Sequence, residues 1–212
     1  MNLSHIRHLL FDLGGVIINL EVPRTHQALG RLAGRDAAEI ARQSKETDLF
    51  SGYETGACTD DEFRRGLRSF LNATAPDDQL DAAWNAMLLD LPPARVELLR
   101  QLRGSYTLLL LSNTNDIHLR EVNAILRQST GVPVLEDLFD RTYYSQRIGL
   151  SKPGAASFRY VLDHAGIAAA DTLFLDDSPE NLRGAQQLGI HTVLIGPSYT
   201  ILDLFADAPT KR

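Results

Sequence analysis

The pattern of apolar and polar positions changes near residue 92, and the part of the chain after it predicts a parallel α/β sheet. Strands are predicted where apolar residues follow one another without alternation, at 106–111, 172–175 and 191–195, with a shorter strand at 141–145. Helices are predicted between them, at 93–103, 116–128, 154–165 and 179–188. Continuous apolar strands that take turns with helices are typical of a parallel sheet covered on both faces.

Residues 21–94 have a different texture, which is polar and helix-like and contains no convincing buried strand. Thr59 and Glu62 have the spacing of a capping box at a helix start. Apolar residues then follow at helical spacing, namely Phe63, Leu67, Phe70 and Leu71. A further amphipathic stretch is indicated by Trp84, Met87 and Leu88.

A first strand is predicted at 8–12, before this helical segment, and we expect it to join the same sheet as the later strands. The fold class predicted is therefore α/β, with a three-layer, Rossmann-like parallel sheet core. The core is predicted to comprise residues 1–20 and 95–212. Residues 21–94 are predicted to be a helical insertion after the first strand.

Composition narrows the class of protein. Hydrophobic residues make up 44% and charged residues 23% of the 212, as is usual for soluble globular proteins. The net charge of −6 argues against broad nucleic-acid binding, which needs a basic surface. The longest aliphatic run, 108–111, is too short to span a bilayer, and the N-terminus lacks the apolar segment of a signal peptide. The single cysteine, Cys58, fits a reducing compartment, so we expect a soluble, cytoplasmic protein without nucleic-acid or membrane partners.

Polar residues follow the predicted strands at the edge where open α/β sheets bind ligands. They are Asp12, Ser112, Asn113, Ser145 with Lys152 just beyond it, Asp176 and Asp177. Two carboxylate sites, a hydroxyl and amide pair and a lysine are thus predicted to converge.

A purely structural role is an alternative interpretation for each of these residues. An aspartate after a strand commonly forms a turn or caps a helix, and Asp177 precedes a proline-initiated helix. Asp12 is distinguished by the two glycines that follow it, because they allow a sharp turn and a close approach of a ligand. Adjacent carboxylates such as Asp176 and Asp177 repel each other unless a cation compensates them, and magnesium favours such oxygen ligands. Lys152 would hold a phosphoryl group and neutralise the aspartates.

In this arrangement the chain resembles the haloacid dehalogenase-like (HAD-like) hydrolase superfamily over nearly its whole length. Residues 11–16 (Phe-Asp-Leu-Gly-Gly-Val) resemble motif I and residues 111–114 (Leu-Ser-Asn-Thr) resemble motif II. Lys152-Pro153 matches motif III, and residues 174–181 (Phe-Leu-Asp-Asp-Ser-Pro-Glu-Asn) match motif IV. The helical insertion resembles the cap domain that one subclass carries.

The resemblance implies a magnesium-dependent phosphatase that acts on a small phosphorylated metabolite. Asp12 would be the nucleophile that forms an aspartyl-phosphate. Magnesium would be bound by Asp12, the backbone carbonyl of Gly14 and a motif IV carboxylate, chiefly Asp177, while Asp176 would orient Lys152 or bind metal-bound water. Ser112, Asn113 and Lys152 would hold the phosphoryl oxygens.

The chain departs from the family pattern at Gly14, where most family phosphatases carry an aspartate that acts as general acid and base. Losing a general acid typically costs about 10²–10⁴-fold in rate. A sub-group of sugar phosphatases with a Phe-Asp-Leu-Gly motif, including α-D-glucose-1-phosphate phosphatases, tolerates the change, so a sugar phosphate with a good leaving group is the substrate expected. Glu54 or His118 would be alternative proton donors.

Two alternatives remain open. Metal-independent 2-haloacid dehalogenases also lack an acid at this position, but they lack the paired aspartates of motif IV. A catalytically degenerate HAD-like domain that only binds a phosphorylated ligand is the other.

Overall fold

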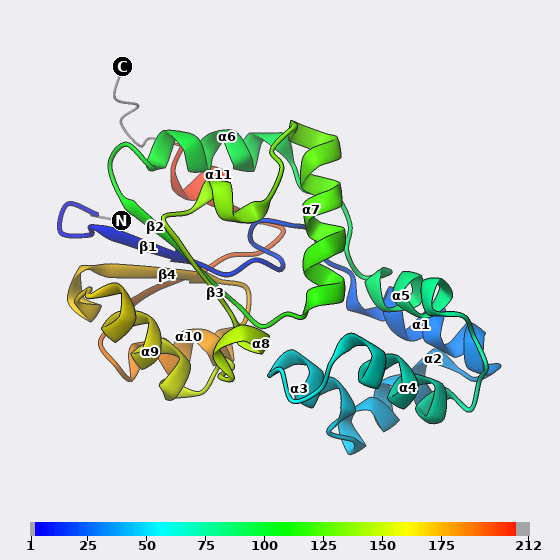
Figure 1. Cartoon of the computed structure of the whole chain (residues 1–212). Coiled ribbons are helices and arrows are strands. Elements are labelled where there is room, and N and C mark those ends of the chain that lie inside the picture. The colour runs from blue at the N-terminus through cyan, green and yellow to red at the C-terminus, as the bar shows by residue number, and fades with distance from the viewer. Residues whose placement is uncertain (1–2, 207–212) are drawn as a thin grey trace.

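A five-stranded parallel sheet lies at the centre of the computed structural model, which describes residues 3–206. Its strands are β1 (His8–Phe11), β2 (Thr107–Ser112), β3 (Arg141–Tyr144), β4 (Thr172–Asp176) and β5 (His191–Leu194). The strand order is β3-β2-β1-β4-β5 (Figure 1). Since the chain moves from β1 to one side and later returns to the other, β1 lies at the switch point where such sheets bind ligands.

Helices cover both faces of the sheet and give three layers. One layer contains α6 (Pro93–Leu102), α7 (Asp116–Thr130) and α11 (Ile201–Leu204). The other contains α9 (Ala155–Ala165) and α10 (Pro179–Gln186). Successive strand residues supply the two cores, since Leu9 and Leu108 pack toward the first layer and Leu10 and Leu109 toward the second.

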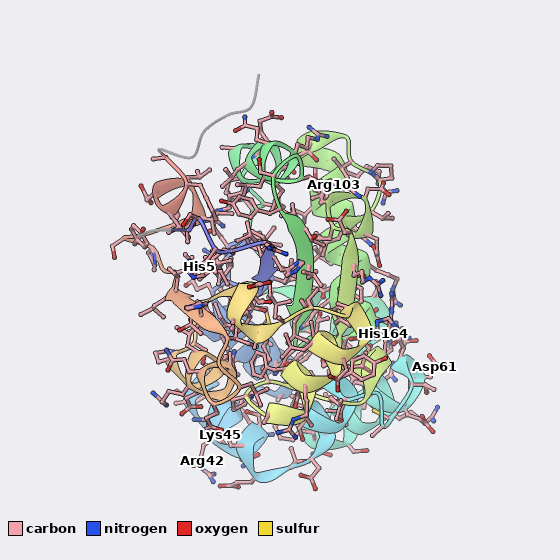
Figure 2. The ribbon with its side chains drawn as sticks, turned by 90° about the vertical axis from the view of Figure 1, so that its left-hand side faces the viewer. His5, Arg42, Lys45, Asp61, Arg103 and His164 are labelled. Atoms are coloured by element: carbon pink, nitrogen blue, oxygen red, sulfur yellow. The ribbon has the colours of Figure 1, made fainter. Side chains whose placement is uncertain are left out.

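The residues after β1 form a group of helices at the end of the sheet (Figure 1). These are α1 (Val22–Ala33), α2 (Ala37–Gln43), α3 (Leu49–Glu54), α4 (Asp60–Leu71) and α5 (Asp77–Asn85). They share a separate apolar cluster that includes Leu29, Phe63, Leu67 and Trp84, to which α7 contributes Ile117. In the side view of Figure 2, Arg42 and Lys45 in this group lie at the opposite end of the molecule from Arg103 at the end of α6.

Two neighbouring segments connect the helical group to the sheet. Leu20 and Leu88 form an antiparallel bridge, and the Asn19 side chain donates a hydrogen bond of 2.9 Å to Asp90. Thr25 Oγ1 donates to the carbonyl of Trp84 and accepts from the N–H of Met87. Entry and exit of the insertion are therefore fixed to each other.

Most predicted elements are present within two residues of the predicted bounds, and the predicted α/β parallel sheet is confirmed. The capping box of Thr59 and Glu62 is formed. The amphipathic helix predicted through Trp84, Met87 and Leu88 was wrong in its extent, because α5 ends at Asn85 and Leu88 instead pairs with Leu20. Within residues 3–206 no helix is long and apolar enough to cross a membrane.

Candidate active site

Asp12 stands directly after the central strand β1, where its N–H donates to the carbonyl of Leu175 in β4 at 2.9 Å. The register of β1 and β4 pairs Phe11 with Leu175, so Asp12 and Asp176 emerge side by side. Carboxylate oxygens of Asp12, Asp176 and Asp177 all lie within 4.8 Å of one another. The convergence predicted from the strand ends is present.

Lys152 compensates this concentration of negative charge. Its Nζ lies 2.6 Å from Asp12 Oδ1 and 2.7 Å from Asp176 Oδ2, and its side chain is 1% exposed. Burial by itself lowers the pKa of this amine, but Asp12 and Asp176 outweigh that effect and hold the pKa above its usual range. Lys152 is therefore a charged, fixed group with two anionic partners.

Asp176 is fully buried and its two oxygens are engaged. In addition to Lys152, it accepts hydrogen bonds from the N–H of Ser178 at 2.8 Å and from the amide of Asn181 at 3.0 and 3.1 Å. The side chain of Asp177 is exposed and makes no side-chain hydrogen bond or ion pair with another residue among residues 3–206. The two adjacent aspartates thus differ, with Asp176 orienting Lys152 and Asp177 open to a ligand.

The carboxyl groups have perturbed acidities. Burial raises the pKa of Asp12 above its usual range and Asp176 adds to this, while Lys152 opposes both. The pKa of Asp177 is also raised, first by burial and then by Asp176. A cation bound beside these carboxyl groups would lower both pKa values and favour the ionised carboxylates.

The loop after Asp12 brings backbone close to this cluster. Gly15 has a φ of +69°, and a Cβ there would collide with Asp177 Oδ2, so this position requires glycine on both counts. The N–H of Gly15 donates to the carbonyl of Ile18, while the carbonyl of Gly14 accepts no hydrogen bond from any described residue. Asp12, Asp177 and the Gly14 carbonyl therefore offer the oxygen donors that a magnesium ion prefers, and the residues fit the predicted metal.

The predicted phosphate-binding residues lie at the end of β2. Ser112 is its last residue and is buried, and Asn113 follows it. The amide of Asn113 donates to the carbonyl of Lys152 and accepts from its N–H, both at 2.9 Å. Asn113 therefore positions the lysine and retains one amide N–H for a ligand.

A cavity of about 340 Å³ opens beside these residues, between the sheet and the inserted helices. Gly14, Ser112 and Asn113 are part of its lining. The rest of its lining is mostly apolar and includes Leu20, Val22, Leu29, Phe50, Trp84, Met87, Leu88 and Val122. Its titratable side chains are Glu54, His26 and His118.

His118, predicted as a weak candidate proton donor, is unsuited to that role. Its Nδ1 lies 2.9 Å from Asn85 Oδ1 and its ring stacks on Trp84 at 4.7 Å. Burial lowers its pKa to about 3, so the ring is neutral at neutral pH. A neutral imidazole is a poor acid, and the stacking indicates a structural part.

Two contributors to the site were not predicted. Asn181 holds both oxygens of Asp176, and Leu20 occupies the space beside Gly14. Asn181 lies in the quoted motif IV segment, three residues after Ser178 at the helix cap, which is the signal that could have indicated it. Leu20 has no spacing signal, because its position depends on the bridge to Leu88.

Comparisons with known proteins agree with this geometry. A D-ribitol-5-phosphate phosphatase from Bacteroides thetaiotaomicron is 29% identical over 88% of this chain and 90% of its own. A sesquiterpene phosphatase from Aspergillus oryzae is 28% identical over 85% of each chain. A crystal structure of a HAD family enzyme from B. thetaiotaomicron in complex with magnesium and inorganic phosphate superposes with a TM-score of 0.85. It is 37% identical and covers 94% of this chain and 99% of its own.

Residues 6–189 match the haloacid dehalogenase-like hydrolase family, and this span includes all of the site residues described above. The chain belongs to the haloacid dehalogenase-like hydrolases.

Proposed function

We propose that the chain is a magnesium-dependent phosphatase that hydrolyses a small phosphorylated metabolite through an aspartyl-phosphate on Asp12. The observation that carries the proposal is the arrangement of Asp12 and Lys152 at 2.6 Å beside Asp177. A carboxylate nucleophile, a fixed cation and an open carboxylate at the switch point of a parallel sheet suit phosphoryl transfer, which depends on positioning and charge neutralisation.

Asp12, the Gly14 carbonyl and Asp177 are the residues that would hold magnesium. When bound there, the ion would neutralise charge on the phosphoryl oxygens and favour the ionised form of Asp12. That a HAD family relative was crystallised with magnesium and inorganic phosphate supports this assignment.

The chain's own residues suit both half-reactions. In the first, an oxygen of Asp12 forms a bond to phosphorus as the bond from phosphorus to the alcohol oxygen breaks. In the second, water attacks phosphorus, the bond to Asp12 breaks, and inorganic phosphate leaves. Lys152, Ser112 and the free N–H of Asn113 hold the phosphoryl oxygens throughout, and Asp176 keeps Lys152 in place.

A sugar or polyol phosphate is the substrate class we propose first. The D-ribitol-5-phosphate phosphatase relative supports it, as does the motif I resemblance to α-D-glucose-1-phosphate phosphatases. A phosphate ester of an apolar alcohol is the second candidate, which the largely apolar lining of the cavity favours. Hydroxyl groups of a sugar would find few free partners on that lining, because Thr25 and His118 already bond within the protein.

We further propose that residues 21–94 act as a cap domain that reads the substrate, with residues 1–20 and 95–212 as the catalytic core. The cap supplies most of the cavity lining, including Val22, Phe50 and Trp84. The single cysteine is compatible with a reducing compartment, and we propose that the enzyme works in the cytoplasm.

The test is phosphate release from a panel of sugar, polyol, prenyl, acyl and aryl phosphates, with and without magnesium, with Asp12→Asn as the control. We expect magnesium-dependent release that Asp12→Asn abolishes. Halide release from a 2-haloacid in the presence of a chelator would establish the dehalogenase alternative instead. If wild type and Asp12→Asn were both inactive on every ester, the protein would be a catalytically degenerate domain that only binds its ligand.

A further inference from the structure

The usual position of a general acid, residue 14, has no side chain in this protein. A Cβ on Gly14 would meet the Cδ1 atom of Leu20, so an apolar side chain occupies the space beside the nucleophile. An alkoxide is a poor leaving group unless it is protonated as it departs. If the proposed phosphatase acts on alkyl esters, the proton has to come from another wall of the cavity.

Three titratable side chains line that cavity, and the protonated forms of two of them are disfavoured. His118 from α7 is neutral and stacked on Trp84. Burial, with a smaller contribution from Lys45, lowers the pKa of His26 from α1 and so disfavours its protonated form. Glu54, the last residue of α3, is the third.

Contacts on both sides of Glu54 hold it against the sheet core. The hydroxyl of Tyr53 accepts a hydrogen bond from the N–H of Ile117 in α7 at 3.3 Å and donates to Asp60 at 2.6 Å. Gly56, with a φ of +75°, packs so closely on the carbonyl of Gln146 that a Cβ would collide with it. The short turn at Glu54 is thus fixed at two points on the core.

The carboxyl group itself has no hydrogen bond or ion pair with any residue in 3–206. It lines the same cavity as Gly14, Ser112 and Asn113. An unpartnered carboxyl group in a largely apolar wall is costly for the fold, which points to a functional reason for its presence.

We propose that Glu54 is the general acid and base that serves the proposed phosphatase in place of an acid at position 14. In the first half-reaction its carboxylic acid gives a proton to the alcohol oxygen as the bond from that oxygen to phosphorus breaks and Asp12 bonds to phosphorus. In the second, the resulting carboxylate takes a proton from the attacking water as the bond to Asp12 breaks. Each turnover restores the proton that Glu54 gave, so the cycle balances.

The acidity of Glu54 suits both roles. Burial raises its pKa to about 7, and burial is the sole cause of the shift. The other titratable side chains that line the cavity are His26 and His118, and neither of them contributes to the shift. An acid with a pKa near the working pH is available in both protonation states.

The experiment compares Glu54→Gln with wild type, both in the presence of magnesium. Two substrates with different leaving groups are used, namely an alkyl phosphate and dinitrophenyl phosphate. We expect kcat/KM for the alkyl ester to fall by about 10²–10⁴-fold. For dinitrophenyl phosphate, kcat/KM stays within a few-fold, because that phenolate leaves without a proton. A burst of dinitrophenol followed by slow turnover is expected, since the second half-reaction loses its base. Glu46→Gln, an exposed glutamate of the same helical group paired with Arg42, is the matched control and should match wild type.

Three outcomes would overturn the role. An equal loss of kcat/KM on both substrates would indicate a structural effect, and a rise in KM at unchanged kcat would indicate that Glu54 only reads the substrate. Unchanged kinetics would place the acid elsewhere. A wild type that hydrolyses neither ester would overturn the proposed function itself, and this role with it.

Discussion

The side chain of Leu20 fills the space into which a side chain on Gly14 would project. Leu20 is held there by its bridge to Leu88, at the point where the chain enters and leaves the helical insertion. A side chain at position 14 therefore requires the end of the Leu20 side chain to shift.

This close approach makes a prediction for the stability and activity of Gly14→Asp. Alone, the change forces Leu20 to move and should cost about 1–3 kcal/mol of unfolding free energy, as overpacking does. Combined with Leu20→Ala it should fold with less strain and place an acid beside Asp12. Urea unfolding measures the first effect. The second is measured as kcat/KM on an alkyl phosphate in a Glu54→Gln background.

In the Glu54→Gln background, we expect Gly14→Asp/Leu20→Ala to raise kcat/KM on the alkyl phosphate at least ten-fold. This is a fraction of the contribution of about 10²–10⁴-fold that a general acid usually makes. Leu20→Ala alone is the control and should recover none. No recovery in a folded, magnesium-binding protein would show that an acid at position 14 cannot reach the leaving group.

Lys152→Met should lower activity and stability more than any substitution in the cavity lining. Lys152 is buried against two carboxylates at 2.6 and 2.7 Å, and its removal leaves both without compensation. Breaking one partner of a buried ion cluster typically costs about 3–5 kcal/mol. We expect loss of activity and a lower urea midpoint, and millimolar magnesium should restore part of the stability because the ion replaces the lost charge. A urea midpoint that does not change when magnesium is added would argue against a metal site at these aspartates.

Asn181→Ala tests the support of Asp176. The amide of Asn181 is a donor to both oxygens of that carboxylate, at 3.0 and 3.1 Å. Residues that orient the groups around a metal commonly contribute about 10–100-fold to activity or metal affinity. We expect a fall of that size in kcat/KM, with a higher magnesium requirement. Glu180→Gln, an exposed neighbour on the same helix, is the control and should leave both unchanged.

The sequence predicted the sheet and its strand ends because continuous apolar runs in a parallel sheet are visible without any tertiary information. Asp12, Lys152 and Asp176 could be grouped for the same reason, since parallel strands bring their carboxyl ends to one edge. The different roles of the Asp176 and Asp177 side chains could not be predicted from the sequence. Adjacent residues in a strand end point in opposite directions, and only the contacts decide which one holds the lysine.

The residues that line the cavity could not be predicted from the sequence either. Its lining comes from helices and from both connecting segments, and no spacing rule joins Leu20, Glu54 and Trp84. The helix predicted through Met87 and Leu88 failed for a related reason, because tertiary pairing with Leu20 outweighs the local amphipathic pattern there. Glu54 was a candidate from sequence, but its lack of a partner appears only in the folded chain.

Glu54 should also make stability depend on pH in a direction opposite to that of most carboxylates. Its pKa in the folded state is raised to about 7 by burial, so the folded protein retains a proton that the unfolded chain has lost. Stability therefore falls as pH rises from the unfolded pKa toward 7, and levels off above it. Because the side chain is partly exposed, we expect a penalty of about 1–3 kcal/mol at pH 8. Urea unfolding of wild type and Glu54→Gln at pH 5 and pH 8 measures it. The two proteins should be similar in stability at pH 5, whereas at pH 8 Glu54→Gln should be the more stable. A stability difference that is the same at both pH values would show that Glu54 does not carry the raised pKa, and the acid role proposed for it would lose its thermodynamic basis.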